Sequence, residues 1–504
     1  MSESSEKPTG PDFTQGVPIG SIPEGGVLAG HVGDDVVIIG RTAEGLSAIT
    51  GTCSHYGGAL ADGLRVGDTV HCPLHHACFD LATGRALRAP ALSPVDRWKV
   101  DERDGKVFIT EKLPAPDPAE PTDTPERNIV IIGGGAAGFA AAQRLRDLGF
   151  DGRITMISDD PDAPYDRPNV SKDYLAGTAQ PEWMPLKDKR FYEENHIDLR
   201  VDVTVDHVDG EHCTVTLDSG ERLDYDTLLL CTGAEPIRPD GPGFDDSRVF
   251  TVRTMQDAQA IIAAIDGGGP VAVLGSSFIG MEVAASLRER KVEVHVIGPE
   301  AVPLKRVLGD DVGTMIRALH EAHGVIFHLG RKATGYVDGA VTLDDGSAVE
   351  ARHVVLGIGV RPRIALAEAA GLDLDNGVLV DATMRTSNED IYAAGDIARF
   401  PGLDDSRQRV EHWVVAERHG QVAAAAMLGF DEIYNEAPFF WSVHYDTSIR
   451  YVGHALEWDE IEVLGSIEAK VAEIRYKKAG RELAVATINR DKASLEAAER
   501  LANA

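Results

Sequence analysis

Two patterns of apolar and polar residues divide the chain. From about residue 15 to 112, short β-rich runs such as VVIIGRT and KVFIT are broken by Gly and Asp, which is typical of a small all-β domain. From residue 127, a buried-strand run, NIVIIG, leads through a glycine cluster into an Ala-rich helical stretch and a second strand, RITMIS. This order predicts a βαβ unit.

The same order recurs over residues 270–297, as PVAVLG, SSFIGMEVAASLRERK and VEVHVIG. Two such units imply two bound dinucleotides. We therefore predict a multidomain protein: a small all-β domain, two α/β Rossmann-like domains, and an α+β C-terminal domain of strands and a terminal helix. The predicted bounds are 15–112 for the all-β domain, 113–126 for a Pro- and acid-rich linker, 127–243 and 377–432 for the first nucleotide domain, 244–376 for the second, and 433–504 for the C-terminal domain.

Composition limits the kinds of partner that the protein is expected to bind and the compartment in which it is expected to occur. The formal net charge of −32 disfavours binding to nucleic acid or anionic lipid, although solubility alone also explains such a charge. No apolar run reaches the roughly 18 residues that a membrane-spanning helix needs, and the polar start MSESSEKPTGPDF lacks the apolar core of a secretory signal. Five cysteines are too few for a disulfide framework in so long a chain. We expect a cytoplasmic protein without membrane contact.

The all-β region carries two short loops that each supply one Cys and one His, Cys53-Ser-His55 and Cys72-Pro-Leu-His75. A Rieske [2Fe–2S] cluster needs two thiolates on one iron and two imidazoles on the other, which these residues supply. A zinc site with two Cys and two His uses the same ligand types and is the alternative. The Gly-Gly and Cys-Pro-x-His contexts favour the cluster. Three neighbours are interpreted as bystanders: His71, His76 and Cys78.

The segments CSHYGGALADG and CPLHHACFD resemble the Rieske family. Respiratory members carry a disulfide between the two loops, but this chain has Gly58 and Leu74 at the matching positions, so it is similar to the ferredoxin-like group. The family commonly has Gly after the second histidine ligand, where this chain has His76.

The first glycine cluster, Gly133-Gly-Gly135-Ala-Ala-Gly138, lies where a strand ends and a helix begins, as in a dinucleotide fold. Asp159 is the candidate for the ribose contact, with Asp160 as its competitor. Further segments resemble the pyridine-nucleotide–disulfide reductase superfamily, namely YDRPNVSK, LCTG and TSNEDIYAAGD. The resemblance implies FAD at this site, held also by Arg167, Thr232, Gly395 and Asp396.

No paired cysteines lie near these segments, which excludes the disulfide-reductase branch. The segments RVEHWVVAERHG and APFFWSVHYDTSIRYVGHA resemble instead the ferredoxin-reductase and apoptosis-inducing-factor-like branch, and within it the group with an N-terminal Rieske domain. The resemblance adds Glu411 and His412 to the FAD site. It places Trp413 and Trp441 near the flavin ring, with plain core packing as the alternative for each.

The second glycine cluster, Gly275-Ser-Ser277-Phe-Ile-Gly280, predicts the NAD site, together with Gly359 in a second loop. Glu300, after the next strand, is the candidate for the ribose contact and favours NADH. Many relatives carry this acid two positions earlier, at Gly298, and the nearby cations Lys305 and Arg306 keep NADPH open.

Lys172 and Glu282 form an ion pair beside the flavin ring in this branch, and they are the predicted catalytic residues here; two unrelated surface charges are the alternative. Two other groups are dismissed as metal sites. His320-Glu-Ala-His323 lacks the zincin spacing, and His412, Glu417 and His419 fall within the flavin-reductase signature rather than an iron triad.

These features predict an NAD(P)H-dependent flavoprotein that passes electrons through FAD and the Rieske cluster to an unidentified one-electron acceptor protein. Two alternatives stay open: a redox-gated signalling protein of the apoptosis-inducing-factor type, and an NADH oxidase whose Rieske domain is only structural. A homodimer also stays open.

Overall fold

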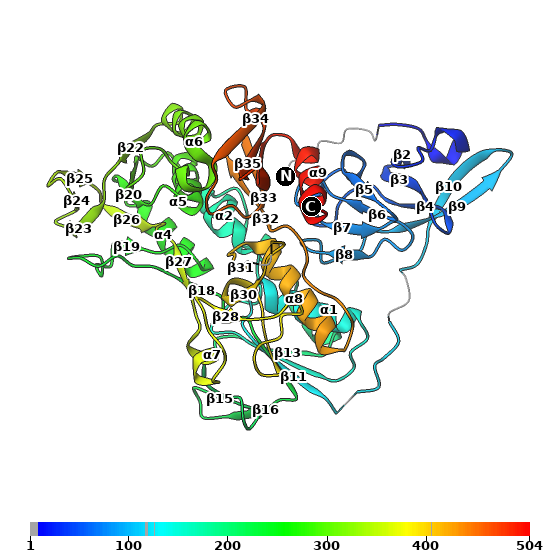
Figure 1. Ribbon diagram of the computed structural model, residues 1–504, viewed down its shortest axis with the longest axis horizontal. Coiled ribbons are helices and arrows are strands. Elements are labelled where there is room, and N and C mark those ends of the chain that lie inside the picture. The colour runs from blue at the N-terminus through cyan, green and yellow to red at the C-terminus, as the bar shows by residue number, and fades with distance from the viewer. Residues whose placement is uncertain (1–8, 116–118, 125, 405) are drawn as a thin grey trace. The chain divides into compact units, whose positions relative to one another are not determined.

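The computed structural model describes residues 9–115, 119–124, 126–404 and 406–504. Residues 1–8 of the polar start, and 116–118 and 125 of the predicted linker, lie outside this range. The chain forms two compact units (Figure 1). The first comprises Met1–Pro121, Asp147–Gly149 and Arg490–Ala504, and the second comprises Thr122–Arg146 and Phe150–Asn489.

The first unit contains two antiparallel sheets. The larger has the order β1-β10-β9-β4-β3-β2, with bounds β1 Val17–Pro18, β2 Val27–Val32, β3 Asp35–Thr42, β4 Gly45–Thr50, β9 Arg97–Arg103 and β10 Lys106–Lys112. The smaller has the order β5-β6-β7-β8, with bounds β5 Leu64–Val66, β6 Thr69–His71, β7 Cys78–Asp80 and β8 Ala86–Arg88. Ile38, Ile49 and Phe79 join the two sheets in one apolar core.

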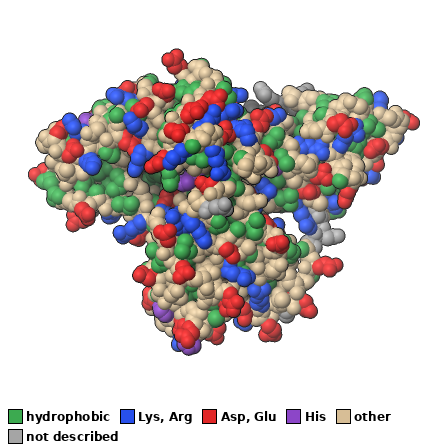
Figure 2. All heavy atoms as spheres, viewed as in Figure 1, with side chains coloured by type: hydrophobic (Ala, Val, Ile, Leu, Met, Phe, Trp, Pro, Cys, Tyr) green, Lys and Arg blue, Asp and Glu red, His purple; other side chains and the backbone are tan. Residues whose placement is uncertain are grey.

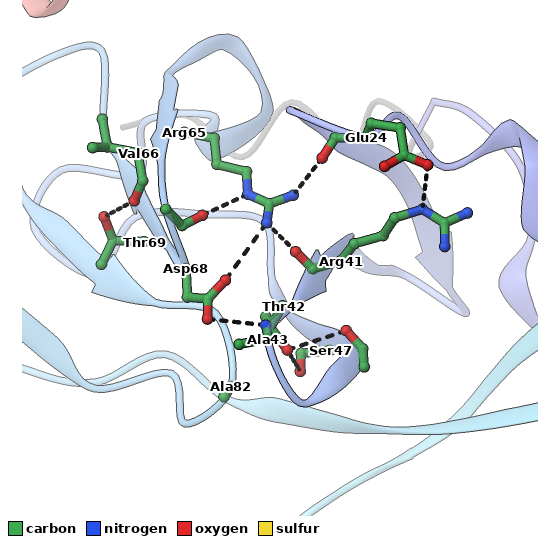
Figure 3. Close-up of polar contacts among 12 residues, drawn as sticks. Glu24, Arg41, Thr42, Ala43, Ser47, Arg65, Val66, Asp68, Thr69 and Ala82 are labelled. Carbon is green, nitrogen blue, oxygen red and sulfur yellow. Dashed lines mark hydrogen bonds and ion pairs between the residues drawn. The ribbon is translucent and has the colours of Figure 1, made fainter.

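Arg65 ties the small sheet to the large one (Figure 3). Its guanidinium donates to the carbonyl of Gly67 at 2.9 Å, to that of Gly26 at 3.0 Å, and to that of Arg41 on β3. Asp68 accepts from the backbone N–H of Ala43 at 3.1 Å. The five N–H groups of an arginine suit this role, because one side chain satisfies carbonyls on β3 and on the segments beside β2 and β5.

The C-terminal helix α9 (Asp491–Ala502) belongs to this first unit. Its buried residues, including Leu495 and Leu501, lie on one face, and α9 contacts β5 (Figure 1). The predicted segment 433–504 is therefore divided between the two units after Asn489.

The second unit contains two parallel five-stranded sheets. The first has the order β13-β12-β11-β17-β29, with bounds β11 Asn128–Ile132, β12 Arg153–Ile157, β13 Ile197–Arg200, β17 Thr227–Leu230 and β29 Ile391–Ala393. The second has the order β19-β26-β20-β21-β22, with bounds β19 Val249–Phe250, β20 Val271–Leu274, β21 Val294–Gly298, β22 Val325–Leu329 and β26 His353–Leu356. The near-continuous apolar strands follow from burial on both faces.

Each sheet continues from its central strand into a helix that starts at the glycine cluster. β11 leads into α1 (Ala136–Asp147) and β20 leads into α5 (Phe278–Glu289). Other helices are α4 (Met255–Ile265), α6 (Lys305–Ala322) and α8 (Trp413–Met427). The ligand site of such folds lies at the carboxyl ends of the strands, where these helices begin.

The second unit also contains a five-stranded antiparallel sheet in the order β32-β33-β36-β35-β34, beside four smaller sheets of two or three strands among the described residues. Its bounds are β32 Phe439–His444, β33 Thr447–Gly453, β34 Glu460–Ser466, β35 Val471–Lys478 and β36 Arg481–Ile488. One core joins Ile449, Ile474 and Ala486 of this sheet to Ile316 of α6 and Leu287 of α5.

Acidic side chains are scattered among basic ones over the face that Figure 2 shows. None of the described helices is long and apolar enough to cross a membrane.

Candidate functional site

Four predicted cluster ligands meet at the tips of two loops in the first unit. The imidazoles of His55 and His75 approach each other at their Nδ1 atoms, 3.1 Å apart. The thiols of Cys53 and Cys72 are both buried, and contact between them together with burial raises the pKa of Cys53 far above its ordinary value. The side chains thus form one imidazole pair and one thiol pair.

The two loops have matching backbones. Cys53 N–H donates to Gly58 O at 2.8 Å, and Cys72 N–H donates to Ala77 O at 2.8 Å. A Cβ atom at Gly58 would lie 2.8 Å from Cys72 Sγ, so only glycine leaves the sulfur its space. His76 takes a left-handed φ of 65° at the position where the Rieske family commonly has Gly.

The bystander residues have partners of their own. His71 Nε2 lies 3.4 Å from Cys78 Sγ and 3.1 Å from Thr69 Oγ1. His76 Nε2 lies 3.0 Å from the hydroxyl of Ser494 on α9.

A cavity of about 590 Å³ opens in the second unit where β11 and β20 lead into their helices. Most of the predicted nucleotide residues line it: Gly133, Gly135, Asp159, Arg167, Lys172, Thr232, Ser277, Glu282, Gly359, Gly395, Asp396, Glu411, His412, Trp413 and Trp441. Gly138, Gly275, Gly280 and Glu300 do not belong to that lining as the structure describes it.

The glycines that do not line the cavity shape its wall. Cβ atoms at Gly138 and Gly280 would overlap the carbonyl oxygens of Gly133 and Gly275 respectively, so each glycine lets its helix pack directly on the turn before it. Gly133 and Gly275 have φ values of 121° and 112°, which L-residues rarely adopt. The two turns therefore share one geometry.

Buried charge is concentrated around the first of these turns. Asp396 accepts from Arg253 Nη2 at 2.6 Å, and Arg167 reaches the same cavity. Among the residues that the structure describes, the buried Nε atoms of both arginines and the buried Nδ1 atom of His412 have no hydrogen-bond partner. Unsatisfied buried donors are rare in proteins, so these atoms suit a polar ligand in the cavity.

The two candidate ribose acids differ in their partners. Asp159 pairs with Arg363 at 2.7 Å, whereas Asp160 accepts from the Tyr165 hydroxyl at 2.8 Å. On the cavity wall, Thr232 donates to Arg363 O at 2.6 Å. Burial raises the pKa of Glu411, which pairs with Arg409 at 2.6 Å.

Lys172 and Glu282 form an ion pair, with Lys172 Nζ 3.0 Å from Glu282 Oε2. Glu282 also accepts from Ser171 at 2.9 Å and from Ser442 at 2.7 Å. Only 3 % of Glu282 is exposed, so these three donors compensate for its lost hydration. The alternative of two unrelated surface charges is thereby excluded.

The second turn is arranged around Ser277, which donates to Gly357 O at 3.1 Å. Glu300 pairs with Arg306 at 2.8 Å and Lys305 pairs with Asp310 at 2.8 Å, so both cations near this turn already have carboxylate partners. A side chain at Gly298 would press on the Ser276 hydroxyl, which explains why the acid cannot stand at that position.

Two known protein families match the nucleotide-binding region and the cluster-ligand region of the chain. Residues 127–420 match the pyridine nucleotide-disulphide oxidoreductase family, and residues 17–99 match the Rieske [2Fe-2S] domain. The chain belongs to the pyridine nucleotide-disulphide oxidoreductases and carries a Rieske domain. It is an FAD-dependent NAD(P)H oxidoreductase that binds a [2Fe–2S] cluster and transfers electrons from NADH through FAD to an acceptor.

The chain aligns with most of the length of several known proteins. Apoptosis-inducing factor 3 of Mus musculus is 32% identical over 90% of this chain and 77% of its own. The ferredoxin–NAD(+) reductase component of the anthranilate 1,2-dioxygenase system of Burkholderia cepacia is 41% identical over 64% of this chain and 81% of its own. The covalent putidaredoxin reductase–putidaredoxin complex aligns with a TM-score of 0.72 at 33% identity, covering 75% of this chain and 93% of that one.

The residues of this oxidoreductase fit the cofactors of its family. The buried thiols of Cys53 and Cys72 lie beside two imidazoles whose Nδ1 atoms face each other, which is the set of two sulfur and two nitrogen ligands that a Rieske cluster requires. Gly135 leaves room for a pyrophosphate, and the buried guanidinium groups of Arg167 and Arg253 offer it positive charge. The arrangement can therefore hold FAD in one unit and a cluster in the other.

The sequence does not predict three residues of the site: Arg253, Arg363 and Ser442. Arg253 lies in the segment VRTMQD just before α4, and Arg363 lies beyond a short strand. No motif surrounds them, because their function depends on Asp396 and Asp159 far away in the chain. Ser442 is one residue from the predicted Trp441 and faces Glu282 instead.

Proposed function

We propose that this oxidoreductase passes electrons from NADH, through FAD and then its own Rieske cluster, to a one-electron acceptor protein of the ferredoxin type. The observation that carries the proposal is that one chain holds both the nucleotide cavity and a complete set of cluster ligands, Cys53, His55, Cys72 and His75. In the putidaredoxin reductase complex, the reductase is joined to a second protein. Here a redox domain is fused to the reductase.

The cavity residues have distinct roles in this proposal. FAD, when bound, accepts two electrons together and gives them up singly, which a one-electron cluster requires. Gly133, Gly135 and Gly138 admit its pyrophosphate, Asp159 faces its ribose and Asp396 its ribityl chain. Arg167, Thr232, Gly395, Glu411, His412, Trp413 and Trp441 complete the wall around it.

Lys172 and Glu282 act at the flavin ring. The Lys172 ammonium attracts negative charge that develops on the ring, and Glu282 holds the ammonium in place. Gly275, Ser277 and Gly280 form the second turn, where the nicotinamide nucleotide binds, together with Gly359 in the loop after β26.

NADH is the proposed donor. The Glu300 carboxylate accepts hydrogen bonds from the hydroxyls of the NAD ribose. Its ion pair with Arg306 also occupies the guanidinium that would otherwise bind a 2′-phosphate. We also propose the cytoplasm as its compartment, since five cysteines are too few for a disulfide framework in so long a chain and a reducing compartment favours such a composition.

His55 and His75 would hold the side of a bound cluster from which electrons pass to a partner. The ring of Tyr56 stacks on His55 with ring centroids 4.0 Å apart, and 38% of Tyr56 is exposed. A partner that docks on Tyr56 is therefore brought close to the imidazole pair.

The test is Cys72→Ser, with Cys213→Ser as the matched control at a cysteine of the second unit. Serine is a poor replacement for a thiolate on iron. Cys72→Ser should lose the cluster, keep FAD, accept hydride from NADH at a near-normal rate and reduce small dyes. Its reduction of a ferredoxin-type protein should collapse, while Cys213→Ser retains it. Equal rates of ferredoxin reduction in both variants would instead show that the Rieske domain has only a structural role.

The relatives named apoptosis-inducing factor 3 favour a second candidate, a redox-gated signalling protein that forms a homodimer when NADH binds. Analytical ultracentrifugation with and without NADH separates the candidates. Slow turnover with an NADH-dependent change in mass supports signalling, and fast turnover at constant mass supports electron transfer.

A further inference from the structure

A glutamate of α8 is buried directly behind the wall of the nucleotide cavity. Trp413, the first residue of α8, lines the cavity, and so does Ala416. Glu417 follows Trp413 by four residues, so the two side chains are neighbours on the helix surface. Helical side chains lean towards the N-terminus, which directs the Glu417 carboxyl over the turn that carries Trp413. Only 1% of Glu417 is exposed.

The backbone of α8 is held firmly against the first nucleotide turn. A Cβ atom at Gly420 would overlap the carbonyl oxygen of Ala137, so α8 packs directly on α1. On another side, α8 contacts β32. Because these contacts fix the backbone, the orientation of the Trp413 indole depends on the groups that its side chain meets.

Two glutamates are buried beside the cavity, and their partners differ. Glu282 has the ammonium group of Lys172 and two hydroxyl donors. The Glu417 carboxyl receives a hydrogen bond from the Trp413 indole, and its Oε2 atom has no hydrogen-bond partner among the residues that the structure describes. A buried carboxylate needs a cation or several donors to replace its hydration. The environment of Glu417 therefore favours the protonated acid.

The charged group that faces Glu417 strengthens this preference. Burial raises the pKa of Glu417 well above its ordinary value, the Asp166 carboxylate raises it further, and the hydrogen bond from Trp413 opposes the rise. Burial also raises the pKa of Asp166, to about 6, but the Lys172 ammonium and a hydrogen bond from Asn169 at 3.0 Å oppose that rise. Of two neighbouring buried carboxyls, the one with the better partners ionises first. The proton therefore stays on Glu417.

A neutral acceptor suits this side of the cavity. The Lys172 ammonium is placed to attract negative charge that develops on the flavin ring. A carboxylate at Glu417 would oppose that charge, because Coulomb forces are weakly screened in a buried site. A protonated carboxyl can accept the indole N–H through its carbonyl oxygen without adding a net charge. It thus satisfies the indole N–H, which usually has a partner when it is buried.

We propose that Glu417 is a positioning residue which, as a neutral carboxylic acid, holds the Trp413 indole in one orientation in the cavity wall beside the flavin. This inference rests on the proposed placement of the flavin next to Trp413. Glu417 itself does not belong to the cavity lining as the structure describes it, so it acts through Trp413. It keeps its proton throughout the reaction.

The first measurement tests the proton on Glu417. Infrared spectra of the wild-type and Glu417→Gln holoenzymes are compared at pH 7. The C=O band of a protonated carboxylic acid should be present in the wild type, shift in D₂O and be lost in Glu417→Gln. Glutamine keeps a neutral acceptor of similar shape, so this variant should retain FAD and the flavin midpoint potential of the wild type.

An ionised Glu417 would give the opposite results. The carboxylic acid band would be the same in both proteins, and the flavin potential would rise in Glu417→Gln because a negative charge is removed. Either result would overturn the inference. This comparison needs only the conservative variant, so it stands even where a larger substitution prevents folding.

The second measurement tests the positioning of the indole. Glu417→Leu removes the acceptor and keeps an apolar side chain in the space. In stopped flow at saturating NADH, flavin reduction should slow about tenfold in Glu417→Leu, because small displacements at a reacting ring lower the rate steeply. The KM for NADH should change less than kcat, and Glu417→Gln should keep the wild-type rate. Wild-type reduction in Glu417→Leu would contradict the positioning role.

Trp413→Phe separates this inference from the flavin placement on which it rests. Phenylalanine keeps an aromatic ring but lacks the N–H. Trp413→Phe should slow flavin reduction as Glu417→Leu does, and the double variant should be no slower than the slower single variant. Unchanged flavin fluorescence and reduction in Trp413→Phe would refute the placement and the inference together. Slow reduction in Trp413→Phe with a wild-type rate in Glu417→Leu would leave the placement intact and refute the role of Glu417 alone.

Discussion

His76 Nε2 and Ser494 Oγ lie 3.0 Å apart although the two residues are 418 positions apart in the chain. His76 follows the cluster ligand His75, and Ser494, fully buried, lies on α9. The hydrogen bond thus joins a loop that carries a cluster ligand to the C-terminal helix. It also compensates for the left-handed backbone of His76, which costs a non-glycine residue about 1 kcal/mol.

Ser494→Ala should destabilise the cluster-binding unit, because it leaves His76 Nε2 without this partner at a cost of ~1–3 kcal/mol. His76→Gly should be close to neutral, since glycine relieves the left-handed backbone as it loses the hydrogen bond. The double variant should be no less stable than Ser494→Ala alone. Heat-induced loss of the cluster's visible absorbance measures all three, and additive losses would show that the two residues are not coupled.

Glu300→Ala should shift the nucleotide preference towards NADPH. The substitution frees the Arg306 guanidinium from its ion pair, so that it can donate a charged hydrogen bond to the 2′-phosphate of NADPH. Such a bond contributes ~1.5–3 kcal/mol, which corresponds to a gain of roughly ten- to hundredfold in kcat/KM for NADPH. The kcat/KM ratio of the two nucleotides measures the change. Glu300→Ala combined with Arg306→Ala is the control and should lose that gain; an unchanged ratio in the single variant would remove Glu300 from the nucleotide site.

Gly135→Ala should weaken FAD binding without affecting the fold. The nearest protein atom to an added Cβ is Arg167 Nη2 at 3.9 Å, so the methyl group projects into open space that the pyrophosphate would take. Overpacking of ~1–3 kcal/mol would raise the FAD dissociation constant roughly ten- to a hundredfold. Gly138→Ala is the contrasting variant, because its Cβ would strike Gly133 O and destabilise the protein itself. Unfolding of the FAD-free protein distinguishes the two, and unchanged FAD affinity in Gly135→Ala would refute this placement.

His419 should make the second unit acid-sensitive. It is fully buried between Phe400 and Tyr434, and burial lowers its pKa to about 3. Its unfolded-state pKa is near 6.5. The unfolded chain therefore binds the extra proton first, and stability present above pH 6.5 is lost as the pH falls towards 3.

At pH 5 this loss amounts to about 2 kcal/mol. His419→Leu should therefore raise the free energy of unfolding relative to wild type more at pH 5 than at pH 7.5, as measured by denaturant titration. An equal effect at both pH values would mean that His419 does not titrate on unfolding.

The local sequence is sufficient to predict those parts of the site that lie within one short segment. The glycine turns at 133 and 275 and the two ligand loops depend on backbone conformations that neighbouring residues dictate, and the family was identified from them. Lys172 and Glu282 were paired through resemblance, since no periodicity links residues so far apart.

Contacts between distant segments could not be predicted in this way. Arg253 and Asp396 meet because α4 begins and β29 ends near the same cavity, and no residue near Arg253 in the sequence signals this contact. The assignment of α9 likewise depends on packing. Its apolar positions predict an amphipathic helix but not which surface covers them.

The placement of α9 sets an order of events during synthesis. Domains near the N-terminus usually fold first as a chain emerges from the ribosome. The strands that carry Cys53 and Cys72 emerge first, yet the helix with Ser494 follows only after both nucleotide-binding sheets have been translated. The cluster-binding unit therefore reaches its full set of contacts last, and iron and sulfide delivered earlier would meet loops that α9 does not yet support.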